Sequence, residues 1–129
     1  MTIERFGASP VGPGGRALPF AKAVRAGDFV FVSGQVPYGS DGEIVQGSIV
    51  PQTHQAIANV KAILAELGLG LEHVVKATVW LADPRDFWPF NKVYAEYFGA
   101  APPARSCVRA DMVVDCKVEI EVVAYDPRS

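Results

Sequence analysis

The chain has 129 residues, of which 50% are hydrophobic and 20% charged, and its formal net charge is -2. These values fit one globular domain, residues 1–129, that buries about two-thirds of the surface of the unfolded chain. Lysines and arginines form no run, so the chain lacks the basic surface that nucleic-acid-binding proteins use to contact phosphates. A nucleic-acid partner is therefore not expected.

The N-terminal residues lack the basic start and apolar run of a signal peptide, and no apolar stretch approaches the roughly 20 residues of a membrane span. We therefore expect a cytoplasmic protein without membrane contact. Cys107 and Cys116 are too few for a disulfide framework. No metal site is predicted, because the chain has no CxxC motif and its two histidines, His54 and His73, lack ligand spacing.

The first half of the chain predicts a hairpin followed by a helix. Residues 28–34 are an aromatic and β-branched run typical of a buried strand, and residues 20–25 are its expected hairpin partner. Asp41-Gly42 indicates a tight turn. Apolar residues then recur at helical spacing over residues 51–67, and Gly68 stands where a glycine commonly ends a helix.

The second half alternates strand and helix. Residues 74–81 predict a strand, and residues 86–98 a helix with Asp86 as its N-terminal cap, Pro89 in its first turn and Gly99 after it. Residues 101–108 and 117–125 read as two more strands. This order predicts an α+β fold in which two helices pack on one face of a mixed sheet.

Two ionisable residues in the last two strands suggest chemistry on a small carboxylate. Arg105 can hold a planar carboxylate through two parallel hydrogen bonds, and a glutamate on a nearby strand can move a proton or activate water. An arginine at a strand end is also commonly part of a surface ion pair, and most arginines are exposed. Strand periodicity places Lys117, Glu119 and Glu121 on one face, so the pattern alone does not choose between the glutamates.

Six motifs, in order along the chain, resemble the Rid (reactive intermediate deaminase) family, also called the YjgF family. They are Ser33-Gly34-Gln35-Val36-Pro37, Gln55 with Asn59-Val60-Lys61, Val75-Lys76-Ala77-Thr78-Val79, Asn91-Lys92-Val93-Tyr94, Pro103-Ala104-Arg105-Ser106-Cys107-Val108 and Val118-Glu119-Ile120-Glu121. The similarity extends from about Phe20 to Tyr125, which is nearly the whole chain.

The resemblance implies a chorismate-mutase-like α+β fold of the bacillary type and a homotrimer around a central barrel, with sites between subunits. It also implies a cofactor-free hydrolase, in which water attacks the imine tautomer of an enamine acid such as 2-aminoacrylate and releases ammonia and a 2-oxo acid. By motif, Arg105 would bind the carboxylate and Glu119 would handle water or a proton. Ser33 and Asn91 would line the pocket, and the backbone of Cys107 would contact the substrate.

The chain departs from the family at Phe20, where many deaminases of this family carry a tyrosine. If Phe20 lines the pocket, a hydroxyl that could bond the substrate is missing, and the substrate preference is expected to change. Two other classes remain open at this point. One is a non-catalytic protein that binds a metabolite in the same pocket and regulates a partner. The other is a ribonuclease or translation inhibitor, which the acidic charge balance makes less attractive.

Overall fold

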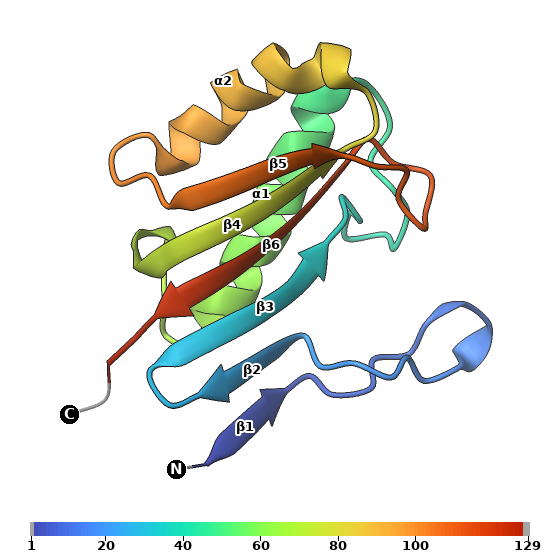
Figure 1. The fold of residues 1–129 in the computed structure, drawn as a ribbon. Coiled ribbons are helices and arrows are strands. Elements are labelled where there is room, and N and C mark those ends of the chain that lie inside the picture. The colour runs from blue at the N-terminus through green and yellow to red at the C-terminus, as the bar shows by residue number, and fades with distance from the viewer. Residues whose placement is uncertain (1, 128–129) are drawn as a thin grey trace.

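The computed structural model describes residues 2–127, which form a six-stranded sheet and two α-helices (Figure 1). In chain order the elements are β1 (Ile3–Phe6), β2 (Ala23–Ala26), β3 (Phe29–Gln35), α1 (Ile49–Glu66), β4 (Val74–Leu81), α2 (Phe87–Phe98), β5 (Ala104–Arg109) and β6 (Val118–Tyr125). Short 3-10 turns lie at Pro13–Gly15, Leu71–His73 and Pro84–Asp86.

The strands lie in the order β1-β2-β3-β6-β4-β5, so β1 and β5 are the edges of the sheet. Strands β4 and β5 pair in parallel, with α2 as their connection, and the other neighbours pair antiparallel. The predicted mixed sheet is confirmed. Strand β1 was not predicted, because its four residues show no buried face of their own and are ordered by pairing Ile3 to Phe6 with Ala26 to Ala23.

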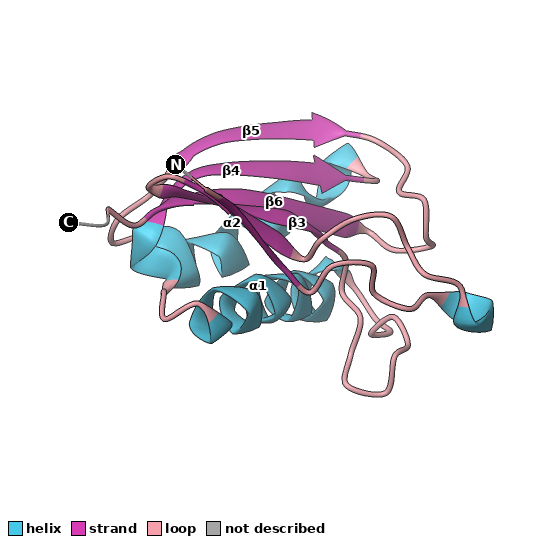
Figure 2. Cartoon of the chain, turned by 90° about the horizontal axis from the view of Figure 1, so that it is seen from below, coloured by secondary structure: helices cyan, strands magenta, loops and turns pink. Residues whose placement is uncertain are grey.

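Both helices cover the same face of the sheet (Figure 2), as predicted. The predicted periodicity of α1 is seen in its buried side chains, and strand β6 alternates buried and more accessible residues along its length. The core between the layers includes Ala56, Ile57, Val60 and Leu64 from α1 and Val118, Ile120, Val122 and Ala124 from β6. None of the helices within residues 2–127 has both the length and the apolar character that crossing a bilayer requires.

The predicted end of α1 and the predicted start of α2, with Asp86 at the N-cap position, are confirmed, but the capping hydrogen bond expected of Asp86 is not formed. Gly68 follows α1 with φ of 75°, the left-handed conformation that favours glycine. Asp86 makes no capping hydrogen bond, because the 3-10 turn from Pro84 already places it in helical geometry. The 3-10 turn that precedes α2 is capped by Asp83, whose Oδ1 accepts a hydrogen bond of 2.9 Å from the backbone N–H of Arg85.

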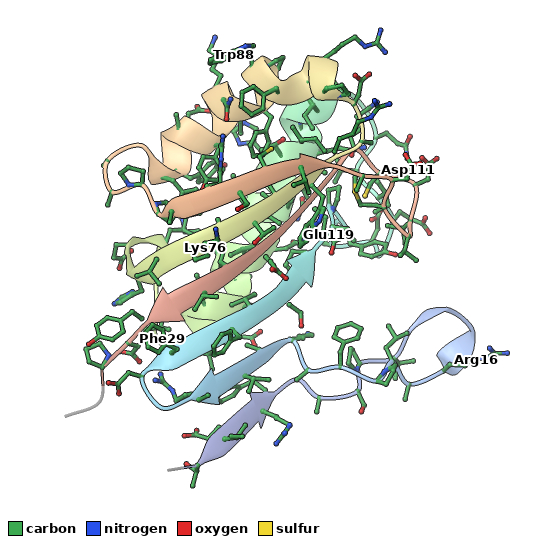
Figure 3. The ribbon with its side chains drawn as sticks, in the orientation of Figure 1. Arg16, Phe29, Lys76, Trp88, Asp111 and Glu119 are labelled. Atoms are coloured by element: carbon green, nitrogen blue, oxygen red, sulfur yellow. The ribbon has the colours of Figure 1, made fainter. Side chains whose placement is uncertain are left out.

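The face of the sheet opposite the helices, called here the open face, carries large apolar side chains. Phe29, Phe31 and Tyr125 are 42–47% exposed on β3 and β6, and the rings of Phe29 and Tyr125 lie 5.3 Å apart. Lys76 and Glu119 lie on the same face and can be followed with Phe29 in Figure 3. A sheet face of this composition is unusual for an isolated domain and is typical of an interface.

Candidate active site

Arg105 lies on the edge strand β5 with its side chain turned toward α2. Its Nη1 donates a hydrogen bond of 2.8 Å to Oδ1 of Asn91. Its Cζ lies 4.9 Å from the ring centre of Tyr94, 5.7 Å from that of Phe90 and 5.8 Å from that of Phe87. The half-buried guanidinium is therefore held by one polar contact and three aromatic rings.

The helix places these four contacts together because positions 87, 90, 91 and 94 follow the i, i+3, i+4, i+7 spacing of one helical face. Asn91 was predicted to line a pocket, and the structure places its side chain on Arg105. The role of the rings was not predicted. Helical spacing identifies such a stripe as buried, but it does not show that an arginine on a strand lies against it.

Arg105 forms no ion pair with an aspartate or glutamate among residues 2–127, where the ion pairs involve Arg25, His54, His73 and Arg85. The alternative that it is half of a surface ion pair is therefore not supported by the structure. Asn91 accepts one hydrogen bond from the guanidinium, which has five N–H donors in a planar fork. The remaining donors fit a planar anion such as a carboxylate.

Cys107 shares the α2-facing side of β5 with Arg105, and its side chain is half-buried. Burial raises the pKa of the Cys107 thiol, with Arg105 acting weakly in the opposite direction. A raised pKa disfavours the thiolate, which fits a packing role for the sulfur rather than a nucleophile. The backbone of Cys107 is better placed than its sulfur to contact a substrate, because β5 is an edge strand that pairs with β4 on one side and leaves its other side unpaired.

Glu119 lies on β6, on the open face of the sheet, opposite Trp80 of β4. Burial, and secondarily the charge of Glu121, raises the pKa of the Glu119 carboxyl above its ordinary value of 4.5. Its carboxylate approaches Gly34 so closely that a Cβ added at that position would overlap Oε2 of Glu119. Gly34 therefore makes room for the carboxylate at the end of β3.

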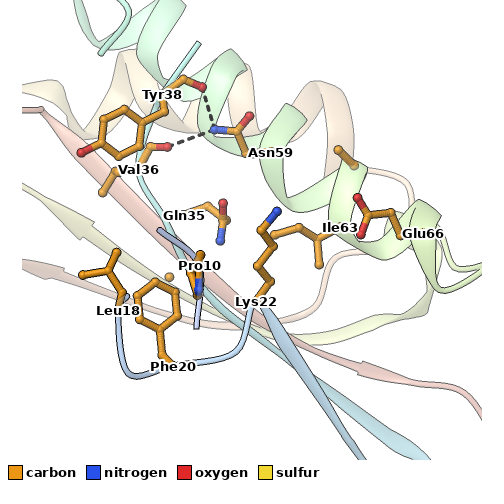
Figure 4. Close-up of a pocket in the computed structure, with 12 residues that line it drawn as sticks. Pro10, Leu18, Phe20, Lys22, Gln35, Val36, Tyr38, Asn59, Ile63 and Glu66 are labelled. Atoms are coloured by element: carbon orange, nitrogen blue, oxygen red, sulfur yellow. Dashed lines mark hydrogen bonds between the residues drawn. The ribbon is translucent and has the colours of Figure 1, made fainter. Parts of the chain in front are cut away.

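Ser33 and Phe20 lie beside Gly34. The hydroxyl of Ser33 donates a hydrogen bond of 2.6 Å to the carbonyl of Ala21, which ties the loop bearing Phe20 to β3. The Phe20 ring is 46% exposed and lines a hollow of about 390 Å³ that Gly34 and Lys22 also border (Figure 4). Ser33, Gly34 and Glu119 thus form a second cluster at the end of β3, whereas the hollow lined by Phe20 is also bordered by Asn59 and Ile63 of α1 and not by Glu119.

The two clusters are separate within one chain. Arg105 pairs with Ala77 of β4 and faces the helices, whereas Glu119 pairs with Trp80 and faces away from them. Three residues along β4 and two strand spacings separate the two backbone positions by roughly 14 Å. A single chain therefore does not bring the predicted carboxylate-binding arginine and the predicted proton-handling glutamate to one substrate.

We expect Gly34→Ala to remove activity that depends on Glu119 while leaving the fold intact. The added methyl would overlap the end of a flexible side chain, so the Glu119 carboxylate would move and the strand would not. Turnover and the thermal unfolding midpoint of the variant would be compared with those of Gly39→Ala, whose nearest contact would be a looser 3.3 Å. A fully active Gly34→Ala protein would show that the position of Glu119 is unimportant.

The fold and the two clusters define a class of small α+β proteins with an aromatic-supported arginine on an edge strand of the sheet. A family model described as Endoribonuclease L-PSP matches residues 15–126. The chain therefore belongs to this family, which includes the Rid, YjgF and RutC proteins, and the resemblance found in the sequence is confirmed.

Relatives of known sequence or structure agree with this assignment. A RutC family protein of Pyrococcus horikoshii is 47% identical over 109 residues, which cover 83% of this chain and 86% of the relative. The YjgF gene product of E. coli superimposes with a TM-score of 0.82 at 32% identity, over 95% of this chain and 98% of that one. E. coli TdcF, solved with bound serine, gives a TM-score of 0.82 at 34% identity, over 98% of this chain and all (100%) of that one.

Proposed function

We propose that this protein hydrolyses reactive enamine and imine acids of the 2-aminoacrylate and 2-iminopropanoate type to 2-oxo acids and ammonia. The observation that carries the proposal is Arg105, a half-buried arginine held by Asn91 and aromatic rings and without a carboxylate partner among the described residues. Such a group is prepared to bind the carboxylate of a small acid. The serine bound to TdcF supports small amino-acid-like ligands in this family.

In this reaction Arg105 binds the substrate carboxylate and orients the C=N bond. The Glu119 carboxylate takes a proton from water as the water oxygen bonds to the imine carbon, and it returns the proton to nitrogen. The C–N bond of the resulting carbinolamine, now protonated on nitrogen, then breaks and ammonia leaves, while the Glu119 carboxylate accepts the hydroxyl proton as the C=O bond forms. Because a protonated imine carbon is already a good electrophile, orientation and proton transfer suffice and the reaction as proposed uses no cofactor.

The same proposal requires a second copy of the chain at each site. The open face bears exposed Phe29, Phe31 and Tyr125, and Arg105 and Glu119 lie on opposite faces of one sheet. A closed ring of three chains around the open faces would cover the apolar surface and could bring Arg105 of one copy to Glu119 of the next. We therefore propose the homotrimer around a central barrel, with a chorismate-mutase-like arrangement.

Light scattering coupled to size exclusion is expected to give about three times the chain mass of 13.8 kDa. Phe31→Glu, which places a charge on the open face, is expected to dissociate the assembly and to abolish turnover, whereas Val113→Glu at a fully exposed loop position leaves both unchanged. A wild-type protein that is monomeric and active would contradict the shared site.

RNA cleavage is the second candidate, because the matching family model is described as Endoribonuclease L-PSP. A Thermotoga maritima structure named as a putative endoribonuclease also superimposes on the chain, with a TM-score of 0.85 at 36% identity over 97% of this chain and 99% of that one. The net charge of -2 does not favour it. A paired assay separates the candidates: release of ammonia from freshly generated 2-aminoacrylate and cleavage of RNA, both by the same chelator-treated protein. Activity only on RNA would overturn the deaminase proposal, and activity on neither would favour a non-catalytic metabolite-binding regulator.

Phe20 is expected to influence substrate preference, because its half-exposed ring borders Gly34. Phe20→Tyr adds a hydroxyl that can donate a hydrogen bond worth about 1 kcal/mol, or a few-fold in rate. We expect kcat/KM to rise a few-fold on 2-iminopropanoate and less on the bulkier imines derived from leucine or methionine. Equal effects on both classes would identify Phe20 as a packing residue.

We place the protein in the cytoplasm as part of this proposal. A relative from Saccharomyces cerevisiae, 45% identical over 111 residues covering 85% of this chain and 77% of the relative, is named as mitochondrial. Fractionation of the source cells would test the location directly.

A further inference from the structure

The aromatic face of α2 has no part in the reaction steps proposed above. Tyr94 is its central member, 7% exposed, and its ring lies closer to the guanidinium of Arg105 than the rings of Phe90 and Phe87 do. The Tyr94 ring is itself fixed between two neighbours, with centroids 5.4 Å from Phe90 and 4.6 Å from Phe98. It is a rigid surface beneath a flexible charged side chain.

The hydroxyl of Tyr94 is buried and has no hydrogen-bond partner among the described residues. The contact with Arg105 is made by the face of the ring, which attracts a cation without neutralising it. A carboxylate partner would occupy the same N–H donors that a substrate carboxylate needs, whereas a ring beneath the guanidinium plane leaves the donors in that plane free.

We propose that Tyr94 is a positioning residue that sets the plane of the Arg105 guanidinium, while the hydrogen bond that Arg105 donates to Asn91 sets its rotation within that plane. This inference rests on the assignment of Arg105 as the carboxylate-binding group in the proposed function. The Tyr94 ring and the hydrogen bond to Asn91 together restrict the rotation of the guanidinium, so less conformational entropy is lost when a planar carboxylate binds. Removing the ring should therefore weaken substrate binding and leave the chemical step almost unchanged.

The direct test measures the affinity of the purified protein for pyruvate, the product expected from 2-iminopropanoate, by titration calorimetry. Tyr94→Phe keeps the ring and is expected to bind within about twofold of the wild type. Tyr94→Leu is expected to bind roughly tenfold more weakly, with KM rising by a similar factor and kcat little changed. Tyr97→Leu is the matched control, because it removes an aromatic ring of the same helix that contacts His54 rather than Arg105.

A double-mutant cycle then asks whether Tyr94 acts through Arg105. In an Arg105→Lys background there is no planar fork to orient, so Tyr94→Leu is expected to cause no further loss of affinity. Equal losses in both backgrounds, or an equal loss in Tyr97→Leu, would overturn the proposal, because either result would mean a general packing effect.

The pyruvate measurements do not depend on turnover, so they separate this inference from the proposed function. If pyruvate binding depends on Arg105 and Tyr94 but the protein does not hydrolyse imines, the positioning role is supported and the deaminase proposal is contradicted. If the wild-type protein hydrolyses the imine and Tyr94→Leu retains wild-type KM and affinity, the deaminase proposal is supported and the positioning role is contradicted. A wild-type protein that binds no 2-oxo acid would also overturn the positioning role.

Discussion

Arg105→Ala is expected to reduce kcat/KM for 2-iminopropanoate by at least about a hundredfold, because it removes two charge-assisted hydrogen bonds to the substrate carboxylate of about 1.5–3 kcal/mol each. Arg105→Lys keeps the charge but loses the planar fork, and we expect a loss of roughly tenfold or more. Steady-state kinetics on freshly generated substrate measures both effects.

The fold and assembly should survive Arg105→Ala, since β5 is held by its pairing with β4 and the core lies elsewhere. Circular dichroism and size exclusion check this point. Arg85→Ala serves as the control, because the Arg85 side chain is 89% exposed and its ion pair is with Asp83, away from Arg105. Arg105→Ala that retains wild-type kcat/KM would remove the carboxylate-binding role and with it the main support for the proposed function.

Glu119→Gln is expected to lower kcat by about a hundredfold and to change substrate binding little, because the amide has nearly the same shape but cannot accept a proton. The raised pKa of Glu119 predicts an acid limb in the rate profile of the wild type. Since the carboxylate is the active form, activity should fall as the pH drops through a midpoint above 4.5, the ordinary value.

Glu121→Gln separates the two glutamates of β6. It removes the lesser of the two causes that raise the pKa of Glu119, so the acid limb should move to lower pH while kcat at neutral pH is retained. A full loss of activity in Glu121→Gln with an active Glu119→Gln would transfer the proton-handling role to Glu121.

The raised pKa of the Glu119 carboxyl also affects the stability of the folded protein. A raised carboxyl pKa means that the folded protein binds the proton more tightly than the unfolded chain does, so its contribution to stability falls as the pH rises between the two pKa values. Glu119→Gln should therefore unfold at a higher temperature than the wild type near neutral pH, and this advantage should vanish below about pH 4. A Tm difference that is independent of pH would contradict the buried-carboxylate explanation.

The secondary structure could be predicted because short-range patterns carry it. The strand at 74–81 matches β4, and the helix over 51–67 matches α1 apart from two residues at its start and one at its end. The helix at 86–98 matches α2 with Asp86 at its N-cap position, but the capping hydrogen bond is made one turn earlier by Asp83, because Pro84 begins a 3-10 turn. Strand β1 was not predicted, because its pairing with β2 joins residues more than 15 positions apart.

The sequence alone determined the residue types available for catalysis and, through its motifs, the family. It placed Arg105 and Cys107 on one strand face and Val118, Ile120 and Val122 on the other side from Glu119, because strand periodicity is a local property. Only the tertiary structure decided that Tyr94 lies under Arg105, that Gly34 accommodates Glu119, and that the two functional residues occupy opposite faces. These relations join residues on different elements, and they depend on strand order and helix packing, which no local pattern encodes.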